Sequence, residues 1–596
     1  MPPHPHTFHI PVMGTGFSID TPLRVARYGI SSVISLVDDA LIEQVRKFHC
    51  QRCGEPYEPI KTGLDKRAKR ITAYLNFIDR KVRRQIETLK AEPFGEGSSI
   101  DRYFELLPAS KLKEDYSRML SERDSAVKTD LQDSLRKQIV AGSIDVNIMT
   151  KLDSGRYYNG EELPAEYADA MQALRGFARS DLSSGIVFSA GINQRLYRYA
   201  AQFDDFFEDE QGELRKKIIV KVSDYRSALI QGKFLAKRGL WVSEFRIESG
   251  LNCGGHAFAS GCSLMGPVLE QFKQNRHVLR ECLHNVYTRA LEEMGRPTTV
   301  QPLKIRITAQ GGIGTSHENH FLLQYYHING TGWGTPFMLV PEVTNVDPAH
   351  LDKLCNAADD DVYLSNSSPL GVRFWNLRTS ASEEMRRKRI DQGNPGSPCP
   401  KGLCLLNQDF PGKPLCVASR SYTKQKLAQL AAEDATNKQA ALLKERVLEK
   451  SCLCHDLAGA VSLNHDTDQK ATPAICCGPN IRNFNRIFSM EEMIDHIYGR
   501  LSLVFKSERP HMFIEEMRLN LDYLKEEIAL FSQRISNRQA GFFDSFKNKL
   551  LEGIDYYRDL TKQFIEEQRE RFLEDLKKLQ EEIEHTCLPE GDAPCP

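Results

Sequence analysis

From about residue 9 to residue 342, short β-rich runs alternate with longer segments of helical periodicity. This alternation is typical of a parallel sheet built from βα units. Eight strands are predicted, at His9–Gly14, Ser31–Ser35, Ser143–Met149, Gly185–Ala190, Ile218–Val222, Ser243–Ile247, Lys304–Thr308 and Gly330–Gly334. Eight such units favour an α/β fold of the (β/α)8 TIM-barrel class. A doubly wound open sheet is the alternative, although no predicted strand leads into a G-x-G-x-x-G turn.

The pattern changes in three other parts of the chain. Residues 50–140 are charged and helix-patterned, and they are far too many for a simple βα connection. We expect a helical insertion there, near the top face of the barrel, with a lid as one role. The predicted organisation is a TIM barrel at 1–49 and 141–370, the insertion at 50–140, a Cys-rich segment at 371–489 and a C-terminal helical region at 490–596.

One helix of the C-terminal region has a regular apolar stripe. Phe572, Leu576, Leu579 and Ile583 recur at three- and four-residue spacing among Glu and Lys. This spacing predicts an amphipathic or coiled-coil helix. The helix packs on its own barrel or forms a seam between two copies in a homo-oligomer.

Composition excludes several classes of protein. The 596 residues carry 79 Lys and Arg against 80 Asp and Glu, so charge gives no case for a nucleic-acid or polybasic membrane partner. No window approaches the roughly 18 apolar residues of a membrane span, and the N-terminus does not read as a signal peptide. The 15 cysteines are odd in number and unevenly spaced, which argues against a disulfide framework. We expect a cytoplasmic protein.

Glycines follow the last two predicted strands. Gly311 and Gly312 come after the seventh strand, and Gly334 and Thr335 come after the eighth. Active sites of TIM barrels lie at the C-terminal ends of the strands, and this pair of loops frequently holds phosphate. Backbone N–H groups of glycines approach an anion closely because no Cβ intervenes. The loops therefore favour a phosphate-bearing cofactor, and simple tight turns are the alternative.

Five strand-end segments carry a family resemblance. They are Pro11-Val12-Met13-Gly14, Asn147 at the end of the third strand, Gly254-Gly255-His256, Gln310-Gly311-Gly312-Ile313, and Gly334-Thr335-Pro336-Phe337. Over residues 8–345, without the insertion, the chain resembles the nitronate monooxygenase (2-nitropropane dioxygenase-like) family. These proteins are FMN-binding TIM barrels and include flavin-dependent enoyl-acyl-carrier-protein reductases. The chain departs from the family pattern at Asn252-Cys253, where a Glu-Ala pair is usual, and at Trp333, where a smaller residue is usual.

The resemblance implies an FMN-dependent oxidoreductase with His256 as the catalytic acid or base, because an imidazole titrates near neutrality. As a monooxygenase the enzyme would take a proton from a nitroalkane and use O₂. As an enoyl-thioester reductase it would use NAD(P)H. The residues implied to contact FMN are Met13, Gly14, Asn147, Lys221, Ser249, Gly254, Gly255, Gln310, Gly311, Gly312, Trp333, Gly334 and Thr335.

The substrate and the electron-transfer partner stay open at this point: a small molecule or an acyl thioester fits the pattern equally. Lys221 is read either as a partner of the flavin N1–C2 carbonyl region or as a solvent-facing lysine. A scaffold that binds a cofactor without turnover is the alternative from a different class, because the large additions to the barrel suit assembly with a partner.

The Cys-rich segment is a second candidate site. Its cysteines are Cys399, Cys404, Cys416, Cys452, Cys454, Cys476 and Cys477. Clustered thiolates with Pro and Gly beside them are ligands for an iron–sulfur cluster. Structural zinc and free thiols are the alternatives. Two weaker metal-binding patterns are Cys50-Gln-Arg-Cys53, to which His49 could contribute, and the pair His317 and His320.

Overall fold

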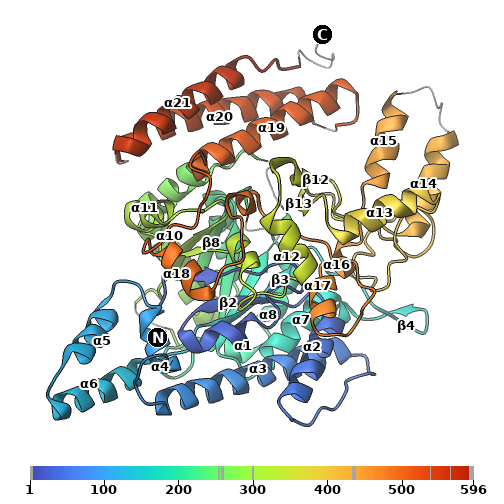
Figure 1. Ribbon diagram of the computed structural model, residues 1–596. Helices are drawn as coiled ribbons and strands as arrows, with labels where there is room; N and C mark the ends of the chain where they lie inside the picture. Colours follow the sequence, from blue (N-terminus) through green and yellow to red (C-terminus); the bar gives the residue numbers. More distant parts are fainter. Residues whose placement is uncertain are drawn as a thin grey trace.

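The computed structural model describes residues 4–189, 191–252, 255–256, 261–298, 301–432, 438–536, 538–563 and 566–589. Within these residues, eight parallel strands close into a barrel in the order β1-β11-β10-β8-β7-β6-β3-β2 (Figure 1). The strands are β1 (Phe8–Ile10), β2 (Ser31–Ser35), β3 (Ile144–Met149), β6 (Ser184–Ser189), β7 (Lys216–Val222), β8 (Val242–Glu248), β10 (Arg306–Gln310) and β11 (Gly330–Gly332).

The TIM-barrel prediction and all eight predicted strands are confirmed. The first strand is shorter than expected and ends at Ile10, because Pro11 has no N–H with which to continue the ladder. The open-sheet alternative is wrong, since β1 pairs with both β2 and β11.

The barrel interior is partly charged. Towards the N-terminal ends of the strands, Glu244 pairs with Arg246 at 2.8 Å and with Arg306 at 3.7 Å, and Thr308 donates to Glu244 at 2.7 Å. A small apolar cluster of Val33, Val187 and Ile219 lies further along. Because side chains alternate along a strand, polar residues two positions later face the open end of the barrel.

Capped helices surround the barrel. Asp38 accepts a hydrogen bond from the Leu41 amide at the start of α2, and Thr315 and Glu318 form a capping box at the start of α11. These caps end the βα loops and fix where each helix begins. The surrounding helices are α1 (Thr21–Val25), α2 (Asp39–Arg52), α7 (Asp169–Ala178), α8 (Gln194–Ala200), α9 (Tyr225–Ala236), α10 (Met265–Glu293), α11 (Ser316–Tyr325) and α12 (Pro348–Cys355).

Residues 50–140 are helical, as the pattern predicts. They contain α3 (Lys66–Ala91), α4 (Ser99–Glu105), α5 (Lys111–Ser121) and α6 (Ser125–Gln138). Helix α3 packs closely on α7, where a Cβ on Gly176 would lie 2.8 Å from the Ala68 carbonyl oxygen. Helix α4 contacts the turn that precedes β2, and the Tyr103 hydroxyl bonds to Val140 just before β3. Helices α4 to α6 therefore lie towards the N-terminal ends of the strands, and α5 and α6 project from the barrel (Figure 1).

The segment after the barrel folds back onto it. Strands β12 (Val362–Ser365) and β13 (Phe374–Leu377) form a small antiparallel sheet with β9 (Gly255–His256). A separate two-stranded sheet, of β4 (Tyr157–Tyr158) and β5 (Glu161–Glu162), lies in the loop that follows β3. The following helices are α13 (Ala381–Asp391), α14 (Arg420–Ala432), α15 (Lys438–Leu448), α16 (Leu453–Asp456) and α17 (Gly459–Asn464). This segment shares one continuous apolar core with the barrel through residues such as Phe374, Leu457 and Val461.

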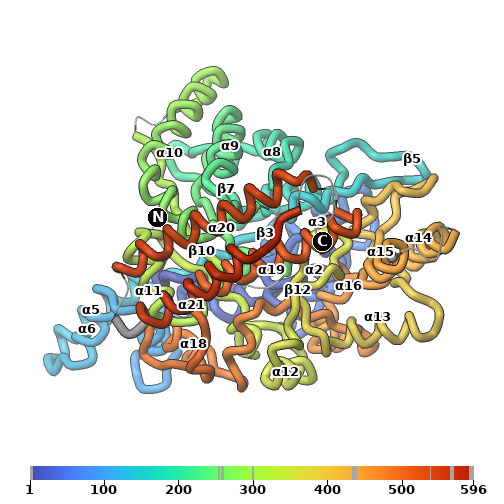
Figure 2. The backbone as a smooth tube through the Cα atoms, turned by 90° about the horizontal axis from the view of Figure 1, so that it is seen from above, coloured from blue at the N-terminus to red at the C-terminus, as the bar shows by residue number. Residues whose placement is uncertain are grey.

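The C-terminal helices are α18 (Met490–Ile497), α19 (Met512–Ser532), α20 (Ala540–Leu560) and α21 (Glu566–Glu584). Helices α19, α20 and α21 lie side by side, and α19 and α20 contact α10 (Figures 1 and 2). The predicted stripe of Phe572, Leu576, Leu579 and Ile583 is buried. The stripe packs against other helices of the same chain, so it gives no reason to expect a homo-oligomer seam.

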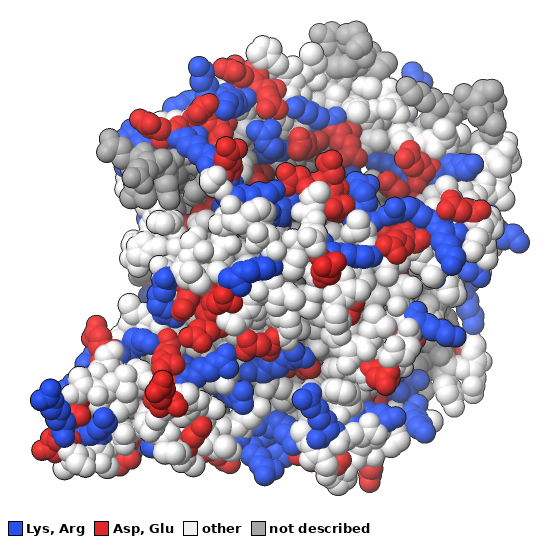
Figure 3. Space-filling model, viewed as in Figure 1, with Lys and Arg blue, Asp and Glu red and all other residues white. Residues whose placement is uncertain are grey.

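The face shown in Figure 3 carries Lys and Arg intermixed with Asp and Glu, as the balanced composition implies. Among the described helices none is long and apolar enough to cross a membrane.

Candidate functional site

A cavity opens at the C-terminal ends of the barrel strands. The space not filled by protein atoms is about 900 Å³, and part of it is open solvent and not enclosed cavity. This is the end of a TIM barrel at which active sites lie. The strand ends contribute Gly14, Thr15, Ser35, Asn147, Ser189, Lys221 and Glu248, and the later segments contribute Ser368, Phe374, Cys404, Cys454 and Cys476.

Five of the residues predicted to bind the cofactor or to act in catalysis meet in this cavity. They are Gly14, Asn147, Lys221, Gly255 and His256. No residue of the segment 50–140, all of which is described, lines the cavity. The walls that close it come from the segment after the barrel, so the lid role predicted for 50–140 finds no support in the cavity lining.

His256 lies on β9, which pairs with β13 so that His256 is opposite Phe374. Its Nε2 lies 2.6 Å from the Ser368 hydroxyl, and the Phe374 ring meets the imidazole edge-on at 5.1 Å. The Asn252 amide donates to the His256 carbonyl at 2.6 Å. Burial, with Lys221 and Lys151 as further causes, lowers the pKa of His256 to about 4. The imidazole is therefore neutral at pH 7, and burial makes it a weaker base than a free imidazole.

Lys221 is held by a carboxylate. Its Nζ lies 2.9 Å and 2.8 Å from the two carboxylate oxygens of Glu248, and Gln310 donates to the same carboxylate at 2.8 Å. The alternative of a solvent-facing lysine is wrong, since the side chain is largely buried. The pair places one positive and one negative group on the wall of the cavity.

Two buried polar atoms at the cavity have no hydrogen-bond partner among the described residues: Asn147 Oδ1 and Thr15 Oγ1. Leaving such an atom unpaired costs about 1–3 kcal/mol. Both atoms are able to accept a hydrogen bond from a ligand in the cavity.

The predicted phosphate loops do not line this cavity. Asn480 donates to the carbonyl oxygens of Gly312 and Ile313 at 2.8 Å each. The Gly478 amide donates to the Thr335 hydroxyl at 3.2 Å. The loops are thus covered by residues of the Cys-rich segment, which sequence patterns gave no means to place there. Gly311 and Gly312 have φ values of +102° and +82°, a backbone conformation that glycine adopts without strain.

Five other predicted cofactor contacts also lie outside the cavity lining. Met13 is buried in the core. The Ser249 hydroxyl donates to Glu516 at 2.6 Å, and the Trp333 indole donates to Thr331 at 3.2 Å. Gly334 and Gln310 do not line the cavity, and Gly254 lies outside the described residues.

The cysteines of the Cys-rich segment separate into two sets. Five of them gather beside the cavity: Cys399, Cys404, Cys416, Cys452 and Cys454. Cys476 lies elsewhere on the cavity wall, next to Gly14, and Cys477 is buried in the main core. The seven predicted ligands therefore do not form one group, because the turn before Gly478 carries the last two onto the barrel loops.

The two weaker metal patterns do not assemble. Cys53 is exposed and Cys50 is buried in the core. His49 bonds to Asp20 Oδ2 at 3.0 Å instead. His317 and His320 line a separate surface hollow beside Tyr498.

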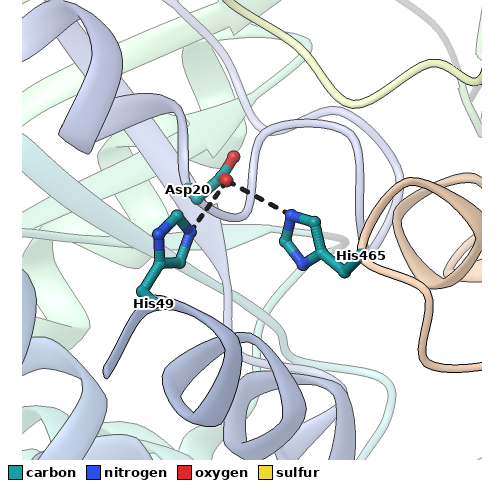
Figure 4. A group of neighbouring side chains, drawn as sticks. All are labelled: Asp20, His49 and His465. Carbon is teal, nitrogen blue, oxygen red and sulfur yellow. Dashed lines mark hydrogen bonds and ion pairs between the residues drawn. The ribbon is translucent and has the colours of Figure 1, made fainter. Parts of the chain in front are cut away.

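Asp20, His49 and His465 form a cluster that joins the barrel to the Cys-rich segment (Figure 4). His465 Nε2 lies 3.7 Å from Asp20 Oδ2, and its ring stacks on Phe48 at 3.8 Å. Arg24 donates to the same carboxylate oxygen at 3.1 Å, and Asn345 donates to Oδ1 at 2.6 Å. Because a cationic guanidinium already contacts the carboxylate, we interpret the cluster as a structural network.

Sequence reasoning missed Thr15, Glu248, Asn252 and Ser368. Glu248 follows Glu244 and Arg246 at two-residue spacing, so the alternation along β8 was a signal that it points to the open end. Ser368 lies 112 residues after His256, and no sequence pattern connects the two.

No family model and no curated protein matches the chain. A solved structure that it resembles is the enoyl reductase domain of MlnA from the macrolactin biosynthesis cluster of Bacillus amyloliquefaciens. The sequence identity is 15%, the TM-score is 0.34, and the match covers 68% of this chain and 88% of that chain. A likeness of this degree gives no information on activity. The comparisons therefore do not support the nitronate monooxygenase resemblance, whereas the barrel that it implied is confirmed.

Proposed function

We propose that this protein is an oxidoreductase whose cofactor ring lies in the cavity at the open end of the barrel, with His256 as a general base. The observation that carries the proposal is the convergence of Gly14, Asn147, Lys221 and His256 on one cavity from strands far apart in sequence. The unpaired Asn147 oxygen in the same cavity is the kind of group that orients a polar ring.

FMN is the cofactor that we propose, and the cavity fits its ring better than its phosphate. Asn147 and Thr15 offer unpaired polar atoms, and Lys221 offers a charge. The predicted phosphate loops, in contrast, already bond to Gly478 and Asn480. FMN binding therefore requires either that this turn moves or that the phosphate lies elsewhere.

The chain's own residues would perform the proton chemistry. A neutral imidazole accepts a proton from an acidic C–H of the substrate, and the Ser368 hydroxyl on Nε2 fixes the orientation of the ring. Asn252 holds the backbone of His256 in place. A bound flavin would supply the two-electron redox chemistry, and O₂ would be the terminal acceptor.

The two substrate classes place opposite demands on His256, since a nitroalkane gives up a proton and an enoyl thioester takes one. We propose oxidation of an acidic carbon, as in a nitroalkane, with reduction of an enoyl thioester with NAD(P)H as the alternative. The enoyl reduction needs a proton donor, and a histidine with a pKa of about 4 holds no proton at neutral pH.

The test is the absorption spectrum of the full-length protein, followed by heat release and identification of the bound group. We expect a two-banded flavin spectrum, released FMN, and O₂ consumption with a nitroalkane. His256→Ala should keep the flavin and lose turnover. His277→Ala is the matched control, because His277 is an exposed histidine on α10. Protein that is colourless and does not take up FMN would refute the proposal.

A further inference from the structure

Five thiols from two parts of the chain converge at the edge of the cavity. Cys399, Cys404 and Cys416 come from the loops before α14, and Cys452 and Cys454 come from the start of α16. All but Cys399 are buried, and Cys399 is partly exposed. They pack with Leu403 and Ala418 as a small cluster separate from the main core.

The sulfurs form a continuous series of contacts. Cys399 is in side-chain contact with Cys416 and Cys452. Cys454 is in side-chain contact with Cys404 and Cys452. Cys404 and Cys454 also line the cavity that holds His256. The series therefore extends from the partly exposed Cys399 to the cavity wall.

Packing alone does not account for this arrangement. A single buried cysteine packs as a small apolar residue, whereas five cysteines gathered from two segments are a candidate metal or redox site. Thiolates gathered from separate segments are the ligand set of a zinc ion or of an iron–sulfur cluster.

The spacing of the sulfurs distinguishes a zinc site from an iron–sulfur site. In a tetrahedral zinc site the Zn–S distance of about 2.3 Å places every pair of sulfurs about 3.8 Å apart. No three of these five sulfurs, all in described residues, lie within 4.8 Å of one another. In a two-iron cluster each iron takes two thiolates, so the ligands form two close pairs, and the two pairs lie further apart than the ligands of a single ion.

We infer that four of these five thiolates hold an iron–sulfur cluster at the edge of the cavity. Cys399, Cys404 and Cys416 are three of the ligands, and the fourth is one of the adjacent pair Cys452 and Cys454. Loading replaces the thiol protons by metal–sulfur bonds, so each ligand releases its proton to solvent. The cluster lies next to the cavity and does not depend on what the cavity binds.

The experiment uses the full-length protein purified without oxygen, with iron, acid-labile sulfide and zinc measured per chain. We expect about two irons and about two sulfides, and a broad visible absorption that dithionite bleaches. Cys399→Ala, Cys404→Ala, Cys416→Ala and the double variant C452A/C454A should each lose most of the iron. Cys53→Ala and Cys587→Ala are the controls and should keep it, because both cysteines are exposed and remote.

Stoichiometric zinc without iron would overturn the inference. So would protein that stays free of iron after anaerobic reconstitution with ferrous iron and sulfide. Far-ultraviolet circular dichroism of each variant shows whether it is folded, and reconstitution of the wild type tests the site where a variant does not fold. FMN content is measured separately, so iron without flavin would refute the proposed function and leave the cluster standing.

Discussion

Glu516 on α19 is fully buried at the junction of the barrel and the C-terminal helices. The Ser249 hydroxyl donates to its Oε1 at 2.6 Å, and the Met265 amide donates to its Oε2 at 2.7 Å. Burial raises the pKa of Glu516 from 4.5 to about 7, against these two hydrogen bonds, which lower it. A glutamine keeps one donor and one acceptor, as a protonated carboxyl does. Glu516→Gln therefore mimics the protonated state at every pH.

The sign of the effect follows from the direction of the shift. The folded protein binds this proton more tightly than the unfolded chain does. The stability from the protonated group is therefore fully present below pH 4.5 and is lost as the pH rises through 7. At 1.36 kcal/mol per pKa unit, the whole shift corresponds to about 3 kcal/mol, of which about 2 kcal/mol is lost between about pH 5.5 and pH 8.

The assay is urea-induced unfolding of the wild type and Glu516→Gln at these two pH values. We expect the free energy of unfolding of the variant to gain about 2 kcal/mol relative to the wild type at the higher pH. Glu552→Gln, an exposed glutamate on α20, is the control and should follow the wild type. Parallel pH dependence of the wild type and Glu516→Gln would refute the raised pKa.

Two further substitutions test the close packing at Gly142 and the buried ion pair of Arg509. Gly142→Ala places a Cβ 2.0 Å from the Ile30 carbonyl oxygen. The midpoint of thermal unfolding should therefore fall, because the free energy of unfolding decreases by about 3 kcal/mol. Gly541→Ala is the control and should leave the free energy of unfolding unchanged, because its Cβ enters open space. Arg509→Met removes the cationic partner of the buried Glu318, which lies 2.6 Å away. The free energy of unfolding, measured by chemical denaturation, should fall by about 3–5 kcal/mol. Adding Glu318→Gln to that variant should recover part of the loss, and no recovery would contradict the ion-pair argument.

The barrel was predictable because its strands have a local signature. Strands such as Ser31–Ser35 and Ile218–Val222 are short apolar runs between helices, and burial on both faces of a parallel sheet makes such runs continuous. The same locality explains why Asn147 and His256 were expected at the open end, where both line the cavity. Asn147 lies in the second half of β3 and His256 follows Gly255, and the fold carries both to this end.

The phosphate loops show where local reasoning stopped. Gly311, Gly312 and Thr335 have the composition of an anion site, but Gly478 and Asn480 bond to the same loops from more than 140 residues away. A sequence pattern indicates which ligand a segment is able to bind, but it does not show which distant segment of the chain packs on the same groups. Ser368 was missed for the same reason, because only the β9–β13 pairing brings it to His256.

The pairing of β9 with β13 also bears on the order in which the site is made. The ribosome completes β11 at Gly332, and with it the barrel, before it has made Ser368 and Phe374. A nascent barrel at that stage has His256 but neither its hydroxyl partner nor its strand partner. The site is therefore complete only after the later segment has been made and has folded back onto the barrel.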